Sequence, residues 1–454
     1  MKRINFTRWV CYALILFVPT VFMIGLDGPN ARAASKEPIK VGVLTDLTGP
    51  ASSMVIAMDS WGFPDYLEYI NANGGVKGHP IEYTIVDTSY KMDKIITGYE
   101  KLKGMNIVAL QTSLSPAIAG LKKRFEKDKI CTFIGSATTE GLWPATYTFN
   151  TMPNFADSAG YIIDYLINQA NAQSRDLKKD PIKLAWVFAD NPMGRSILPA
   201  QAYAEARGCV NALSLGIPMI PTDTGATLRR VKAAGVDAII LGHVPAPTAV
   251  VLRDAMRVGL DTPFYSTNMT QADGVIFYSG LMAEGFNEAE SAEPWYAEFQ
   301  EKHPALKLMI DTLKKKHPEG VQEPWKYRRG WTSGMVLVAA LNKAIEKKGW
   351  PITGEDIRNA LDGLTVDMGG IQPPSTYYKG IDNRGCMLHR MNTIKKKQKA
   401  LQTLILVEPV TEFTYAPTVL PKGYEAKCKG LKDFCKKKGW TYFSPESGLI
   451  LGKQ

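Results

Sequence analysis

The sequence predicts an α/β protein whose sheets consist of parallel strands covered by helices on both faces. Short apolar or β-branched runs alternate with stretches of helical pattern from residue 39 to residue 257. Short strands spaced by helices are typical of parallel sheets that are buried on both sides. A chain of 454 residues is longer than one hydrophobic core usually supports, which favours two domains. The content of 45% hydrophobic and 22% charged residues excludes a disordered chain.

The alternation can be followed segment by segment. The clearest predicted strands are 39–44, 81–86, 107–110, 130–134, 184–188 and 238–241. The clearest predicted helices are 61–73, 94–103, 118–127, 158–171, 198–207 and 248–257. In such sheets ligands bind beyond the carboxyl ends of the strands, at loops that lead into helices.

The first 33 residues have the three parts of a secretory signal peptide. A basic start at Lys2 and Arg3 is followed by an apolar run over 9–26 and by the small-residue site Ala31-Arg32-Ala33. A membrane anchor is the alternative, because the apolar run is long for a signal, but Pro19 interrupts it. We expect cleavage near Ala33 and a soluble, periplasmic protein, since no later stretch approaches the roughly 20 apolar residues of a membrane helix.

The formal charge of +10 belongs to the precursor. Without residues 1–33 the chain has 50 basic and 43 acidic residues, and residues 390–454 alone have 13 basic and 5 acidic ones. The remaining body, residues 34–389, is therefore close to neutral, with 37 basic and 38 acidic residues. A neutral body argues against nucleic-acid binding, which needs a basic fold surface. The lysine-rich runs are read as solvated faces, with attraction to an acidic membrane or permease surface as the alternative.

Small hydroxyl residues follow three of the predicted strands. The turns are 45–50 (TDLTGP), 111–116 (QTSLSP) and 135–139 (GSATT). Each alone is explained by capping of the next helix. Three of them at strand ends are better explained by a shared anion site, because helix N-terminal amides and hydroxyl groups together suit a carboxylate.

The order of these motifs resembles the type I periplasmic binding proteins, in particular the branched-chain amino acid (Leu/Ile/Val) binding component of ABC transporters. The motifs are IKVGVL at 39–44, LTGP at 47–50, INANGGVKGHPI at 70–81, the 113–115 turn, IGSAT at 134–138, Asp190 with Met193-Gly194, Thr222-Asp223 and GVDAIILG at 235–242. The similarity is continuous from about residue 38 to 270 and looser to about 410.

The resemblance implies two doubly wound parallel-sheet lobes joined by hinge strands, with one small ligand between them. The first lobe would be 36–155 with 268–370, the second 156–266 with 371–410, and residues 411–454 would form a basic C-terminal extension. Closure of the lobes would trap the ligand and present it to the membrane subunits of an ABC permease. We expect a monomer without a cofactor, a metal or bound nucleic acid.

The resemblance also suggests ligand-binding residues. Ser115 falls on the family's serine that bonds the ligand carboxylate, and Ser136 and Thr138 fall on positions that contact the carboxylate and the ammonium. Asp223 lies where the family places an acid near the ammonium, although capping of the following helix explains it equally well.

The sequence departs from the family pattern where aromatic residues are usual. Met193 replaces an aromatic of the second lobe, and Trp61 follows the first hydroxyl turn as either a core residue or a flat apolar wall. His243 replaces a residue of the loop that faces the cleft, with an exposed loop histidine as the alternative. Methionine and tryptophan predict a large, adaptable pocket that admits aromatic as well as branched-chain ligands.

Enzyme activity is not indicated. No G-x-S-x-G elbow or H-E-x-x-H motif occurs, and the five histidines are scattered. Cys428 and Cys435 flank a lysine-rich stretch, and we expect them to form a local disulfide in an oxidising compartment. Cys131 is expected to be a buried thiol, whereas the pairing of Cys209 and Cys386 is open.

These observations favour a periplasmic solute-binding component of an ABC importer. Its ligand would be an amino acid, branched-chain or aromatic, or a related amphipathic carboxylate. The alternative is a periplasmic ligand-sensing module that docks to a membrane receptor, because one fold serves both roles.

Overall fold

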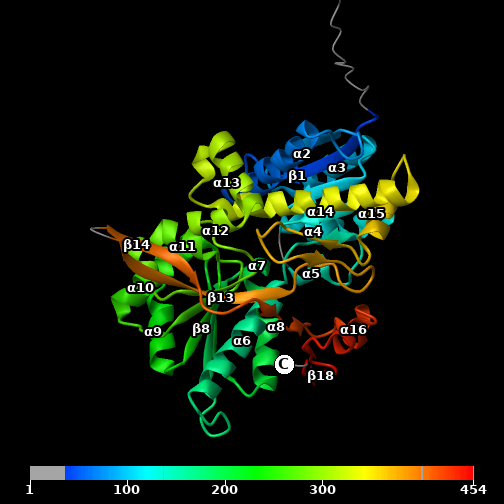
Figure 1. Cartoon of the computed structure of the whole chain (residues 1–454). Helices are drawn as coiled ribbons and strands as arrows, with labels where there is room; N and C mark the ends of the chain where they lie inside the picture. The colour runs from blue at the N-terminus through cyan, green and yellow to red at the C-terminus, as the bar shows by residue number, and fades with distance from the viewer. Residues whose placement is uncertain (1–35, 136–137, 400–401, 453–454) are drawn as a thin grey trace, which may run out of the picture. The chain divides into compact units, whose positions relative to one another are not determined.

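Two sheets of mainly parallel strands organise the residues described by the computed structural model, which are 36–135, 138–399 and 402–452 (Figure 1). The predicted signal peptide, residues 1–33, and the predicted ligand residue Ser136 lie outside the described residues. Among the described helices, none combines the length and the apolarity that crossing a membrane requires.

The smaller sheet has five parallel strands in the order β2-β1-β3-β4-β5. They are β1 (Ile39–Thr45), β2 (Ile81–Asp87), β3 (Ala109–Thr112), β4 (Cys131–Ile134) and β5 (Thr148–Phe149). Successive residues of a strand point to opposite faces, and Val43 and Leu44 of β1 are both fully buried. Both faces of this sheet are therefore covered, as the sequence predicted.

Helices connect these strands in chain order. They are α1 (Ser52–Val55), the π-helix η1 (Ile56–Gly62), α2 (Phe63–Ala72), α3 (Met92–Gly104), α4 (Ser115–Asp128) and α5 (Thr139–Leu142). The predicted helix 61–73 is thus preceded by a π-helical turn, a local irregularity that is frequent at functional sites.

The larger sheet has the order β14-β13-β10-β9-β8-β6-β7, with β15 pairing to β13. Its strands are β6 (Lys183–Ala189), β7 (Val210–Ile217), β8 (Ala238–Gly242), β9 (Phe264–Ser266), β10 (Asn287–Glu290), β13 (Leu388–Lys399), β14 (Gln402–Pro409) and β15 (Thr414–Tyr415). Strands β6 to β10 are parallel, whereas β13 and β14 are antiparallel to their neighbours.

Both faces of the larger sheet carry a hydrophobic core. Trp186 of β6 belongs to a cluster with α6 and α8, and the next residue, Val187, belongs to a separate cluster with α9 and α10. The helices of this sheet are α6 (Phe155–Ala172), α7 (Pro192–Arg195), α8 (Pro199–Ala206), α9 (Gly225–Ala234), α10 (Pro245–Val258), α11 (Ala272–Ser279) and η2 (Gly280–Ala283). The doubly wound arrangement predicted from the sequence is confirmed here.

Three segments of chain join the two sheets: 150–154, 291–296 and 377–387. The second of these corrects the expected division, which assigned 268–370 to the first lobe. Strand β10 pairs with β9 and β13 inside the larger sheet, so the chain returns to the smaller sheet only after Glu290. The sequence misled us because β10 (NEAE) is short and acidic, and polar residues depress strand propensity.

The returning segment packs four helices beside the smaller sheet. They are α12 (Ala297–Lys302), α13 (Pro304–Lys316), α14 (Pro324–Lys348) and α15 (Gly354–Leu361), with η3 (Pro318–Gly320) and the hairpin of β11 (Thr365–Val366) and β12 (Ser375–Thr376). Helix α14 approaches η1 closely, because a Cβ at Gly330 would lie 1.9 Å from the Met58 carbonyl oxygen. This contact fixes the first turns of α14 next to the carboxyl ends of the strands.

The C-terminal extension forms a small three-stranded sheet and a short helix. Its elements are β16 (Thr418–Val419), η4 (Glu425–Lys427), α16 (Leu431–Lys438), β17 (Tyr442–Ser444) and β18 (Gly448–Ile450). Strand β16 packs on α6, and Leu431 and Tyr442 share a hydrophobic cluster with Trp143 of the loop after α5. The extension is therefore folded onto the rest of the chain.

The expected disulfide is absent from this extension. Cys428 and Cys435 are free, buried thiols, as are the other three cysteines of the described residues. The Cys435 Sγ lies 3.5 Å from the Thr418 hydroxyl, to which it donates. Hydrophobic packing, rather than a covalent bridge, holds the two cysteine-bearing segments.

Candidate functional site

Two hydroxyl-rich loops lie side by side at the carboxyl ends of β3 and β4. Thr112 of β3 pairs with Ile134 of β4, so both loops leave the sheet at the same edge. A Cβ at Gly135 would lie 2.1 Å from the Ser113 hydroxyl, which shows that the loops touch. Helix α4 begins in one loop and α5 in the other, and the first amides of a helix favour a negative charge.

The two described hydroxyl residues predicted for the ligand carboxylate lie at this edge. Ser115 is the first residue of α4 and is half-buried. Thr138 is buried at the N-cap position of α5, and its side chain forms no capping hydrogen bond. The structure therefore brings Ser115 and Thr138 to neighbouring loops, as a shared anion site requires.

The hydroxyl group of Ser113, in the loop after β3, bonds to a buried carboxylate of the protein. Ser113 donates its hydroxyl to Asp59 Oδ1 (2.7 Å) and its amide to Oδ2 (2.9 Å), and Gln111 donates to Oδ1 (2.9 Å). Asp59 lies in η1 and is fully buried. Burial raises the pKa of Asp59 to about 6, although these hydrogen bonds act to lower it. Asp59 thus holds the β3 loop in place, a role that the sequence did not suggest.

Arg329 of α14 connects the smaller sheet to the larger one. Its Nη1 donates to the Gly135 carbonyl (3.3 Å) after β4, and its Nη2 donates to the Asn268 carbonyl (2.5 Å) after β9. Arg329 is 6% exposed, and its guanidinium lies over the Trp325 ring, with 5.0 Å from Cζ to the ring centroid. Burial lowers the pKa of Arg329 to about 10, so the group still carries its charge at neutral pH.

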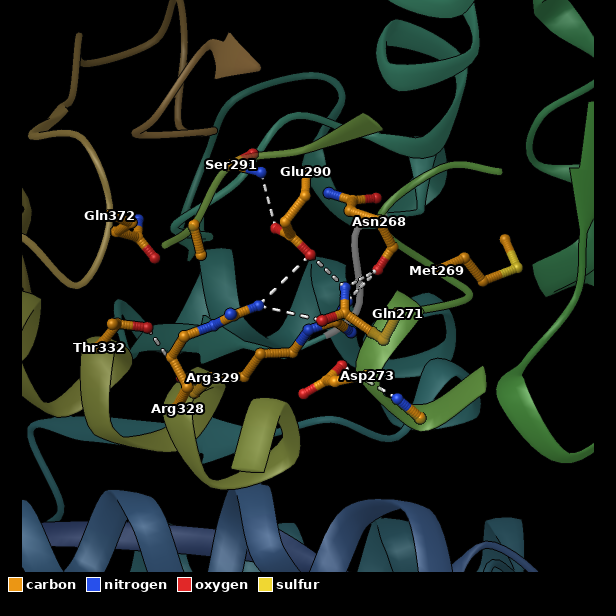
Figure 2. A network of polar contacts seen from close by, with 12 residues as sticks. Asn268, Met269, Gln271, Asp273, Glu290, Ser291, Arg328, Arg329, Thr332 and Gln372 are labelled. Carbon is orange, nitrogen blue, oxygen red and sulfur yellow. Dashed lines mark hydrogen bonds and ion pairs between the residues drawn. The ribbon is translucent and has the colours of Figure 1, made fainter. Parts of the chain in front are cut away.

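A second polar network extends from Asn268 along the larger sheet (Figure 2). Gln271 donates to the Asn268 carbonyl (2.5 Å) and to Glu290 Oε2 (2.6 Å). Arg328 donates to Gln271 Oε1 (3.0 Å) and forms an ion pair with Glu290 (3.4 Å). The Ser291 amide donates to Glu290 Oε1 (2.7 Å), so both oxygens of this carboxylate are engaged.

Buried hydroxyl groups connect this network to His389. One ring nitrogen lies 2.9 Å from the Ser291 hydroxyl and the other lies 2.6 Å from the Ser158 hydroxyl. Ser158 also lies 3.4 Å from the side-chain oxygen of Asn268. Burial lowers the pKa of His389 to about 4, which makes the ring neutral at physiological pH.

A small pocket, with room for about one water molecule, lies beside Glu290. Its wall consists of Gln271, Asp273, Glu288, Glu290, Ala292, Glu293, Pro294, Trp295, Tyr296, Arg328, Asn392 and Val407. Burial, together with the nearby Glu290, raises the pKa of Glu288 well above its usual range. This favours a neutral carboxyl group on that side of the network.

Two residues predicted to line an apolar pocket pack against other side chains of the protein. Trp61 is half-buried and stacks on His317, with 4.5 Å between ring centroids and an angle of 5°. Met193 lies in α7 and packs against the hydrophobic cluster of the larger sheet. In this structure both side chains contribute to packing.

The two polar residues predicted for the second lobe have local partners. Asp223 is exposed, accepts from the Gly225 amide (2.7 Å) and pairs with Arg257 (2.6 Å). His243 is buried: its Nδ1 accepts from the Val244 amide (2.9 Å), and its Nε2 lies 3.2 Å from the Pro218 carbonyl oxygen. Burial lowers the pKa of His243.

The residues that join the sheets were missed from the sequence. Arg329 and Asn268 are 61 positions apart, and no motif spacing links them. The available signal was the pair Arg328-Arg329 a few residues before the apolar run 335–341 of a long helical segment. Charged residues are rarely fully buried without a partner, so this pair was worth attention.

Comparison with known proteins finds a matching family model and similar solved structures. A family model described as periplasmic binding protein matches residues 38–398. Among curated proteins, none matches the sequence.

Solved structures share the fold over most of the chain. A branched-chain amino acid ABC transporter protein from Thermus thermophilus, solved with bound valine, has a TM-score of 0.72 at 22% identity, over 84% of this chain and 97% of that one. A fatty acid ABC transporter substrate-binding protein from Thermomonospora curvata has a TM-score of 0.68 at 24% identity, over 84% and 93%. An ABC transporter substrate-binding protein from Aeropyrum pernix has a TM-score of 0.67 at 17% identity, over 87% and 100%.

Proposed function

This chain belongs to the periplasmic binding protein family, as its motifs predicted, and we propose that it captures a small amphipathic carboxylate for an ABC permease. The ligand class includes branched-chain and aromatic amino acids and related organic acids. The protein is exported after removal of residues 1–33 and delivers its ligand to the membrane subunits of the transporter.

The single observation that supports a carboxylate ligand is the pair of touching loops after β3 and β4. They place Ser115 and Thr138 at one edge of the smaller sheet, where two helices begin. Hydroxyl groups and helix N-terminal amides donate hydrogen bonds to an anion without a formal positive charge. The solved relatives named above are described with valine or with fatty acids, and both ligands carry a carboxylate.

Capture would occur between the two sheets. Each sheet has its own core, and only three segments of chain join them, which is the construction that permits hinge bending. Arg329 spans the two sides by contacting Gly135 and Asn268. A ligand bound beside this contact would stabilise the closed arrangement over any other.

The experiment that tests this proposal is a thermal-shift screen of the purified protein. The panel contains branched-chain and aromatic amino acids, aromatic carboxylates and short fatty acids. Ligands that bind the folded protein raise its melting temperature. We expect Ser115→Ala to weaken a hit by about 1.5–3 kcal/mol, the contribution of a hydrogen bond to a charged group.

Ser214→Ala is the matched control, because Ser214 is exposed on β7 and accepts from Gln201. This variant should bind the hit as tightly as the unaltered protein. If no carboxylate or amino acid in the panel raises the melting temperature, the proposed function is wrong. Equal weakening by Ser115→Ala and Ser214→Ala would remove Ser115 from the site.

A further inference from the structure

Arg329 is a buried cation that lacks a carboxylate partner. Among the side chains that the structure describes, no carboxylate oxygen lies within 4.0 Å of its guanidinium. Its two Nη atoms donate to carbonyl oxygens, which satisfy hydrogen bonds without neutralising the charge. Buried charges in proteins are normally paired, because desolvation of an isolated charge is costly.

Further unused donors belong to residues that Arg329 contacts. The Nε of Arg329 and the side-chain nitrogen of Asn268 are both buried and have no acceptor among the described residues. The indole N–H of Trp325, whose ring lies against Arg329, is also without an acceptor. Asn268 is fully buried, and its side-chain oxygen lies near Ser158. An excess of buried donors around a positive charge calls for an anion.

The location agrees with a ligand site. Gly135, which accepts from Arg329, precedes the loop that contains Thr138, and Asn268 follows β9 of the larger sheet. The guanidinium therefore lies where the carboxyl ends of strands from both sheets come together. In open parallel sheets this is the edge at which ligands bind.

The described carboxylates near Arg329 are poor partners for an ammonium group. Asp223 is exposed and paired with Arg257. Glu290 is engaged by Arg328, Gln271 and the Ser291 amide. Glu288 Oε1, by contrast, is buried without a hydrogen-bond partner. Burial raises the pKa of Glu288 well above its usual range and that of Asp273 to about 6, which disfavours the charged form that would attract an ammonium.

We propose that Arg329 and Asn268 bind an anionic group of the ligand, and that the ligand is an organic monocarboxylate without an α-ammonium group. This inference rests on the proposed function, which it narrows from carboxylates in general to net-anionic ones. Arg329 supplies the positive charge, and Asn268 supplies a neutral donor from the opposite sheet.

The first test compares ligands that differ only in charge. Isothermal titration of the purified protein uses 3-phenylpropanoate, phenylalanine and 3-phenylpropanamide, and in parallel 3-methylbutanoate, valine and 3-methylbutanamide. We expect the acid of the preferred series to bind at least about tenfold more tightly than its amino acid and its amide, the equivalent of one charge-assisted hydrogen bond.

The second test changes the protein. Asn268→Asp replaces the unused amide donor of Asn268 by a carboxylate that repels an anion, so it should weaken binding of the acid by about tenfold or more. The melting temperature of each variant without ligand separates weaker binding from poor folding. Arg329→Lys keeps a charge but loses the guanidinium fork, and should also weaken binding of the acid. Asn342→Asp, on α14, is the control and should leave binding unchanged.

The outcomes separate the two proposals. Binding of phenylalanine or valine in preference to the deaminated acid would overturn this inference and leave the proposed function intact. Binding of the acid with unchanged affinity in both Asn268→Asp and Arg329→Lys would overturn the assignment to these residues. Failure of every acid and amino acid to bind would count against the proposed function itself.

Discussion

Arg384 and Arg329 are two buried arginines that each lie over a tryptophan ring, yet their surroundings are opposite. Arg384 donates to both oxygens of Asp382 (2.9 and 2.7 Å) and to Asp157 (2.8 Å), and lies 4.7 Å from the Trp143 ring centroid. Arg329 contacts two carbonyl oxygens and no described carboxylate.

The difference separates a structural charge from one that remains available. Two carboxylates raise the pKa of Arg384 above its usual value in spite of its burial, whereas burial lowers the pKa of Arg329 to about 10. Arg384 also donates to Thr418 (3.1 Å), so its network fastens the C-terminal extension to α6 through Asp157. Because Asp157 and Asp382 already neutralise Arg384, this guanidinium does not require an anionic ligand.

The largest expected effect comes from breaking the saturated network. Arg384→Met leaves Asp157 and Asp382 buried without a cation, and we expect a loss of about 3–5 kcal/mol in the free energy of unfolding. Urea unfolding followed by circular dichroism measures it. Arg195→Met is the control, because the Arg195–Asp190 pair is exposed and its removal should cost less than about 1 kcal/mol. Equal losses in the two variants would contradict the comparison.

The next effect in size is expected at Asp59. Like Arg329, this residue is buried without a partner of opposite charge, but its own charge is negative. Its pKa is raised to about 6 from an ordinary value of 3.8, so the folded protein favours the protonated form. The contribution of Asp59 to the free energy of unfolding is therefore complete below pH 3.8, and it is lost as the pH rises to about 6.

The shift of about two units corresponds to about 3 kcal/mol. We expect the unfolding free energy of the unaltered protein, relative to Asp59→Asn, to fall by this order between pH 4 and pH 7. Urea titrations at several pH values measure the difference. A difference that stays constant with pH would show that burial does not shift the pKa of Asp59.

The smallest effect is expected at Asp223. Asp223→Asn removes an exposed pair with Arg257 that solvent screens. The melting temperature and the affinity for any ligand should both match the unaltered protein within error, as differential scanning calorimetry and titration would show. A clear loss of affinity would place Asp223 in the site and remove one argument for a ligand without an ammonium.

Much of the fold was accessible from the sequence because it depends on local pattern. The predicted strands of both sheets are present, and the Ser115 and Thr138 loops follow from where those strands end. Strand β10 was missed because its four residues are mostly polar. The Cys428–Cys435 disulfide was wrong, because sequence proximity does not report whether two thiols face one another.

The site could be predicted only in part, since its charged members meet through tertiary structure. Arg329 reaches Gly135 and Asn268 from a helix far along the chain, and Asp59 reaches Ser113 from 54 positions away. Trp61 and His243 looked available because sequence does not show that His317 stacks on one and that backbone groups occupy the other.

The C-terminal extension has a mechanical consequence. It contacts α6, beside the larger sheet, and shares a hydrophobic cluster with Trp143, which belongs to the chain of the smaller sheet. The sheets cannot separate on this side without exposing one of these apolar surfaces to water. The extension therefore works as a strap across one flank, so that any rotation of the halves pivots there and its amplitude is greatest at the loops farthest from the strap.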